Sequence, residues 1–109
     1  DQRYFMIARC ITMLYHYYED DRKAGTWQGF TVDEIMQMAE EYDIHCLENE
    51  TKKDYINLLD EMVEMGILGK PDENRDLYRL RRNSFVDIIG ENFDILEADI
   101  VNYNEEARR

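Results

Sequence analysis

The chain has 109 residues, of which 44% are hydrophobic, so it is long enough for one folded domain and its composition argues against disorder. It carries 25 acidic and 13 basic residues, which give a net charge of −12 at pH 7. This charge repels nucleic-acid phosphates and anionic membranes at long range, so both are disfavoured as partners. No stretch has the pattern of a signal peptide or a membrane span, and we expect a cytoplasmic protein.

The first predicted element is a helix from about Gln2 to Asp21, with apolar side chains at helical spacing in two stripes. One stripe comprises Tyr4, Ile7, Ala8, Ile11, Leu14, Tyr15 and Tyr18, and the other comprises Met6, Cys10, Met13 and Tyr17. One core needs only one stripe, so the second packs either on the C-terminal helix or on another molecule. Cys10 lies within the apolar pattern, which predicts a reduced, buried thiol.

A second helix is predicted from Val32 to about Tyr42. Thr31 and Glu34 match a capping box, in which each side chain accepts a hydrogen bond from the backbone amide of the other residue. Phe30 precedes this cap and belongs either to a short strand or to a tight loop. The outer face of the helix carries Asp33, Glu34, Glu40 and Glu41 and has no basic residue.

A third helix and a hairpin organise the rest of the chain. Apolar spacing predicts the helix up to Met65. Its cap is either Asn49 or Thr51, and Asp54 completes a capping box if Thr51 is the cap. Gly66 ends the helix because a residue without Cβ adopts the left-handed conformation at low cost. Ile67 and Leu68 begin an extended segment, turn formers occupy 71–74, and alternation from 77 to 82 indicates a half-buried strand. This order predicts a winged helix-turn-helix fold, mainly α with a small β-hairpin wing.

Two helices are predicted after the hairpin. Asn83 and Ser84 are a cap for a short apolar helix that ends at Gly90. A last helix runs from about Glu91 to Ala107 and has a narrow apolar seam at Phe93, Leu96, Ile100 and Tyr103. We therefore predict a winged-helix domain at 1–90 and an appended C-terminal helix at 91–109, which packs on that domain or on a partner.

Catalytic and metal sites have little support in the sequence. His16, His45 and Cys46 lack the paired ligand spacing of a zinc site, and adjacent carboxylates such as Glu40 and Glu41 fit a solvated helix face. The five glycines form no phosphate-binding loop. We therefore expect no enzyme, no metal and no cofactor.

A nucleic-acid surface would use the third helix and the wing, because winged helices place that helix in the major groove. Its candidate residues are Lys52, Lys53, Asn57, Lys70, Arg75, Arg79, Arg81 and Arg82. Residues 70–82 hold five basic and three acidic side chains, whereas residues 50–65 hold five acidic and two basic ones. The helix that would face phosphates is therefore acidic, and protein contact is favoured over DNA contact.

A protein interface is predicted from the two apolar stripes at the chain ends. Its candidate residues are Met6, Cys10, Met13 and Tyr17 on the first helix, and Phe93, Leu96, Ile100 and Tyr103 on the last. If the two helices cover each other, the product is a monomer. If the last helix projects, both stripes are exposed, and a symmetric dimer would cover them. The sequence favours the dimer.

Three segments resemble a known family: Gly29–Ile35, Leu58–Leu68 and Tyr78–Gly90, and the opening Asp1–Tyr4 is also similar. They resemble the winged-helix region that follows the nucleotide-binding core of bacterial AAA-type and STAND-type NTPases. Because the chain has no Walker lysine, the resemblance implies a non-catalytic interaction or regulatory module cut from a larger bacterial NTPase. Its partner would be another protein, its own NTPase domain or a second copy. Nucleic-acid binding is the alternative function.

Overall fold

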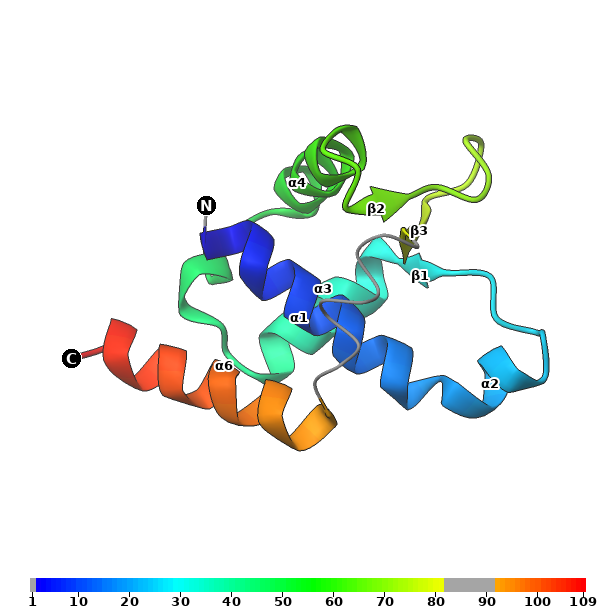
Figure 1. Cartoon of the computed structure of the whole chain (residues 1–109). Coiled ribbons are helices and arrows are strands. Elements are labelled where there is room, and N and C mark those ends of the chain that lie inside the picture. Colours follow the sequence, from blue (N-terminus) through cyan, green and yellow to red (C-terminus); the bar gives the residue numbers. More distant parts are fainter. Residues whose placement is uncertain (1, 82–91) are drawn as a thin grey trace.

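The computed structural model describes residues 2–81 and 92–109. They form a mainly helical fold with a small three-stranded antiparallel sheet. The elements are α1 (Gln2–Tyr17), α2 (Glu19–Lys23), β1 (Phe30–Thr31), α3 (Val32–Glu41), the 3₁₀ turn η1 (His45–Leu47), α4 (Lys52–Glu64), β2 (Leu68–Gly69), β3 (Leu77–Leu80) and α6 (Phe93–Ala107). In Figure 1, α1 crosses the middle of the molecule, with α4 above it and α6 below it.

The predicted first helix is divided at Tyr18, so the prediction of one helix to Asp21 is wrong. Tyr18 has φ −93° and ψ 23°, and α2 begins directly after it. Its ring packs on Phe30, with 6.3 Å between the ring centroids. Arg22 Nε donates to the Tyr15 carbonyl at 2.9 Å. The break is therefore stabilised by one ring contact and by a side-chain donor for a carbonyl at the end of α1.

The capping box predicted at Thr31 is present, and Thr51, rather than Asn49, caps α4 in a second one. At α3 the Glu34 amide donates to Thr31 Oγ1 at 3.1 Å, and the Thr31 amide donates to Glu34 Oε1 at 3.1 Å. At α4 the Asp54 amide donates to Thr51 Oγ1 at 3.2 Å, and the Thr51 amide donates to Asp54 Oδ2 at 2.8 Å. These bonds satisfy amides that a helix start leaves without an intrahelical acceptor, so they fix where each helix begins.

The sheet has the order β1-β3-β2, with Phe30 opposite Tyr78 and Leu68 opposite Leu80. Tyr78 and Leu80 face the core and Arg79 faces outward, which confirms the predicted alternation. Phe30 belongs to a strand and not to a tight loop. A Cβ at Gly29, whose φ is +138°, would lie 3.0 Å from the Tyr78 carbonyl, so this position requires glycine for β1 to pair with β3.

The core is centred on α1, whose Ile7, Cys10, Ile11 and Met13 are fully buried. It is completed by side chains from every layer, including Phe30, Ile35, Leu59, Met62, Leu68, Tyr78, Leu96 and Ile100. Met65 was predicted on the buried face of α4 but is 52% exposed. The cause is a turn at Gly66, where the Ile67 amide donates to the Met62 carbonyl at 3.0 Å, so that Leu68 is the next residue to enter the core.

The helix α6 packs on α1 within the same chain. Met6, Cys10, Met13, Leu96 and Ile100 belong to the core of one chain. Five of the eight residues of the predicted protein interface are therefore buried within the chain, where the two terminal stripes pack together. Of the other three, Phe93 and Tyr103 are half-buried against that core and Tyr17 is 74% exposed.

The predicted short helix from Asn83 to Gly90 lies outside the described residues, as does Arg82. Among the helices that the structure describes, none has the length and apolar character needed to cross a membrane.

Candidate functional site

A groove of about 600 Å³ lies between the helical end formed by α1 and α2 and the β2–β3 hairpin. It is lined by Tyr15, Arg22, Lys23, Trp27, Gly69, Lys70, Arg79, Leu80 and Arg81. Five of these residues are basic and none is acidic, although the chain as a whole carries a net charge of −12. We call this surface the basic groove.

The helical wall of the basic groove is held by stacked side chains. The Arg22 guanidinium lies over the Tyr15 ring, with Cζ 3.4 Å from the ring centroid. The Trp27 ring meets Tyr15 edge to face at 5.9 Å and Phe30 at 5.0 Å. Trp27 Nε1 is buried and has no hydrogen-bond partner among the described residues. This wall therefore carries a positive charge stacked on an aromatic ring, and Trp27 keeps a donor that has no partner among the described residues.

The hairpin wall carries the remaining cations. Arg79 lies opposite Gly69 in the β2–β3 pair, and both Arg79 and Arg81 are exposed. Within the described part of the chain, neither arginine forms an ion pair. Lys70 differs, because its Nζ lies 3.8 Å from Asp76 Oδ1 and 5.3 Å from the Tyr78 ring centroid. The two arginines are therefore the strongest candidates to bind an anion from this side.

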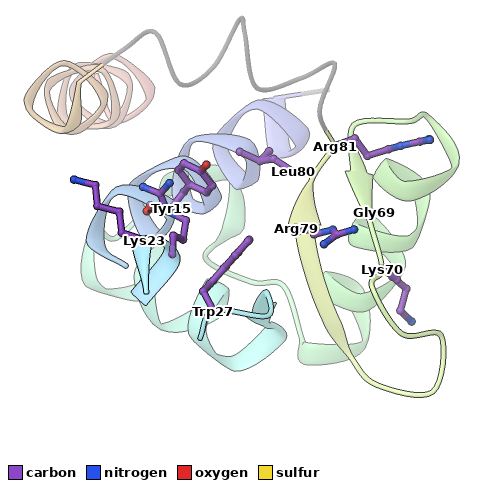
Figure 2. Close-up of a pocket in the computed structure, with 9 residues that line it drawn as sticks. Tyr15, Lys23, Trp27, Gly69, Lys70, Arg79, Leu80 and Arg81 are labelled. Carbon is purple, nitrogen blue, oxygen red and sulfur yellow. Dashed lines mark hydrogen bonds between the residues drawn. The ribbon is translucent and has the colours of Figure 1, made fainter. Parts of the chain in front are cut away.

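The cations are spread along the basic groove and do not converge on one point. In Figure 2, Lys70, Arg79 and Arg81 follow the two hairpin strands, whereas Lys23 points outward from the opposite wall. Trp27, which belongs to the helical wall, lies between Lys23 and the hairpin strands in this view. A small anion needs donors that converge, whereas an extended anionic chain can contact donors in succession. The arrangement suits an extended chain.

The structure brings together only part of the predicted nucleic-acid surface. Lys70, Arg79 and Arg81 line the basic groove, and Arg75 donates to Gln28 Oε1 at 2.9 Å near the hairpin turn. The other predicted residues in the described chain, Lys52, Lys53 and Asn57, lie in the first half of α4, and Lys52 Nζ is 3.2 Å from Asp33 Oδ1. The predicted surface is therefore divided between the two ends of α4.

The exposed face of α4 between these two groups is acidic, since it carries Asp60, Glu61 and Glu64. The Tyr78 hydroxyl donates to Asp60 Oδ1 at 3.0 Å, and the Tyr4 hydroxyl donates to Glu61 Oε2. Burial and the bond to Asp60 raise the pKa of Tyr78, and the bond to Glu61 raises the pKa of Tyr4. Both hydroxyls remain protonated donors at neutral pH, so they hold the two carboxylates in place.

Sequence reasoning missed the helical half of the basic groove. In the sequence, the run from Glu19 to Lys23 is typical of a solvated helix end, and Trp27 is typical of an apolar residue that anchors a loop. The pairing of β1 with β3 brings Trp27 beside the hairpin, and the break at Tyr18 lets Arg22 fold back onto Tyr15. Both arrangements depend on how the chain folds, so the spacing of residues in the sequence does not predict them.

His16, His45 and Cys46 were considered above as metal ligands. No group of three His, Cys, Asp or Glu side chains in the described part of the chain could hold a metal ion. Cys10 is buried, and this burial raises the pKa of its thiol to about 12, so it is protonated at neutral pH and a poor nucleophile.

Comparison of the chain with protein-family models, with curated proteins and with solved structures found no match. The chemistry of the basic groove and of the face of α4 is therefore the basis on which a function can be inferred.

Proposed function

We propose that this chain is a non-catalytic winged-helix module of a larger bacterial NTPase, and that it binds an acidic segment of a partner protein in the basic groove. The order of elements supports the winged-helix assignment. A helix and a short strand precede two helices and a hairpin, and the first strand pairs with the last in the order β1-β3-β2. The link to an NTPase rests on the resemblance of the segments at 29–35, 58–68 and 78–90.

The observation that carries the proposal is the local reversal of charge. Among the described residues, the lining of this groove has five basic and no acidic side chains on a chain of net charge −12, which favours an anionic ligand. Guanidinium groups bind carboxylates in paired hydrogen bonds, and Arg79 and Arg81 have no ion pair among the described residues. An acidic peptide segment presents carboxylates at intervals along an extended chain, as the spread of cations requires.

Nucleic acid is the second candidate, and the same arginines would have to bind its phosphates. Duplex DNA is disfavoured because Asp60, Glu61 and Glu64 lie on the helix that a winged helix would insert into the major groove. Single strands need free aromatic faces on which bases stack. Here Arg22 covers one face of Tyr15, and Trp27 is packed against Tyr15 and Phe30.

Fluorescence anisotropy at physiological salt tests the binding proposal, with a labelled poly-glutamate peptide compared against a random DNA duplex and a DNA single strand. We expect the peptide to bind more tightly than either DNA. Arg79→Gln with Arg81→Gln should weaken peptide binding about tenfold. The matched control is Lys52→Gln with Lys53→Gln, which removes the same charge from α4 and should leave peptide binding unchanged. Tighter binding of DNA, or equal weakening by the control, would contradict the proposal.

The reading frame upstream of residue 1 tests the link to an NTPase. A glycine-rich phosphate loop followed by Lys and Ser or Thr in that frame would support the assignment. A start codon directly before residue 1 would contradict it. This outcome is independent of the peptide-binding result.

A further inference from the structure

A second groove, of about 380 Å³, lies between α1 and α3 and reaches the start of α6. Its chemistry is the reverse of that of the basic groove. Its lining includes the aromatic residues Tyr17, Tyr18, Tyr42 and Phe93 and the acidic residues Glu34 and Glu41, and none of its described lining residues is basic. We call this surface the aromatic groove.

The aromatic rings of this groove have defined positions. Tyr17 and Tyr18 meet edge to face, with 5.1 Å between the centroids and an interplanar angle of 85°. Tyr17 is 74% exposed, although it is a large ring at the end of a core helix. The Tyr42 hydroxyl donates to Glu97, which belongs to α6. The break at Tyr18 and the docking of α6 therefore bring together rings from three helices.

Tyr18 and Tyr42 remain neutral at pH 7, which matters because a neutral ring presents a negative face. A hydrogen bond to Glu34 and burial raise the pKa of Tyr18 to about 12. Burial and the bond to Glu97 raise the pKa of Tyr42 as well. Both rings can therefore attract a cation at neutral pH.

The carboxylates of the aromatic groove come from one face of α3. Glu34 also caps the helix with Thr31, whereas Glu41 is exposed at the helix end. In the part of the chain that the structure describes, neither Glu34 nor Glu41 forms an ion pair. No basic residue occurs in α3, and the net charge of −12 adds to the negative potential at this site.

We infer that the aromatic groove binds a lysine or arginine side chain of a partner protein. The aliphatic stem of that side chain would lie against Phe93 and Tyr42, and the charged end would meet the Tyr17 face and the Glu41 carboxylate. Cations bind aromatic faces within about 6 Å of the ring centroid, and a carboxylate beside the rings strengthens the attraction. This inference goes beyond the proposed function, because it concerns another surface and a cationic ligand.

Two-dimensional NMR titration tests the inference, with N-acetyl-lysine amide and N-acetyl-arginine amide as probes. N-acetyl-norleucine amide is the control ligand, because it has a similar stem without the charge. We expect the two cationic probes, and not norleucine, to shift the ring resonances of Tyr17, Tyr18 and Phe93. Glu41→Gln and Tyr17→Ala should each weaken the binding of the cationic probes about fivefold.

The matched control variant is Glu105→Gln, which removes the same charge from an exposed site on α6 outside the groove. It should leave the affinity of both probes unchanged. The inference would be overturned if Glu105→Gln weakened the binding of the cationic probes as much as Glu41→Gln does. It would also be overturned if N-acetyl-norleucine amide bound as tightly as the cationic probes, or if tetramethylammonium bound more tightly than either of them. The backbone spectrum of each variant shows whether the fold is retained. None of these variants lies in the basic groove, so the poly-glutamate assay is unaffected by the result.

Discussion

Leu59 and Met65 lie on the same helical segment but in opposite environments. Leu59 is fully buried, whereas Met65 is 52% exposed. The periodicity of the sequence places both on the apolar side of α4, because spacing alone does not show where the core ends. Gly66, with φ +81°, turns the chain directly after Met65, and the Ile67 amide then bonds to the Met62 carbonyl. The environment of Met65 is therefore set by the turn.

At the residue scale we predict that Leu59→Ala lowers the free energy of unfolding by about 2–5 kcal/mol, since it leaves a cavity in a closely packed core. Met65→Ala, the matched control, should change it by less than about 0.5 kcal/mol, because the side chain is largely in water. Urea denaturation followed by circular dichroism measures both values. Similar losses for the two variants would mean that Met65 has a packing partner in the folded protein.

At the scale of elements, α6 is fixed to the loop after α3 by polar contacts as well as by its apolar seam. Asn104 is buried, its Oδ1 accepts from the His45 amide at 3.0 Å, and its Nδ2 donates to the Tyr42 carbonyl at 2.8 Å. Arg108 donates to the Asp43 carbonyl at 2.8 Å near the end of the helix. Asn104 thus satisfies two backbone groups that α3 and η1 leave free.

We predict that Asn104→Ala lowers the free energy of unfolding by about 1–3 kcal/mol, because it leaves the His45 amide and the Tyr42 carbonyl without partners. Asn102→Ala is the matched control, since Asn102 is exposed on the same helix. Its effect should stay within about 0.5 kcal/mol. Hydrogen exchange adds a local test, in which faster exchange should appear first at the amide of His45 and along α6. Unchanged exchange at His45 would argue against the role of Asn104.

Elements that depend on neighbouring residues could be predicted from the sequence, and those that depend on distant residues could not. The capping boxes at Thr31 and Thr51 join residues three positions apart, and the alternation in β3 joins residues two apart. In contrast, Asn104 lies 59 residues from His45, and the break at Tyr18 depends on Phe30. Residue spacing carries no information on either contact, so the sequence predicts α6 but not how it docks.

At the scale of the whole molecule, the uneven charge distribution also depends on residues that are distant in the sequence. The cations of the hairpin could be identified in the sequence, because Arg79 and Arg81 alternate with inward-facing residues. Their neighbours in the basic groove, Arg22 and Trp27, come from the opposite wall, which only the fold brings near. A net charge of −12 describes the average surface and conceals both grooves. Half of the candidate site was thus visible in the sequence.

The last prediction concerns the state of association, for which the sequence favours a dimer through the two terminal stripes. In the structure these stripes pack within one chain, and Leu96 and Ile100 are buried against the core that contains Cys10 and Met13. A second copy would gain little apolar burial by displacing this packing. The repulsion between two chains of net charge −12 also opposes association at low salt. We therefore predict a monomer.

Light scattering at micromolar concentration should give a mass near 13.2 kDa. Leu96→Asp with Ile100→Asp should abolish the cooperative urea transition, because it places two charges in the shared core. Ile95→Asp with Val101→Asp is the control, since these residues are 49% and 44% exposed on the same helix, and it should leave both mass and stability unchanged. A different result would contradict the monomer: the unmodified chain would have twice the monomer mass, and the Ile95→Asp, Val101→Asp variant would have the monomer mass. This outcome would place a dimer interface on the outer face of α6.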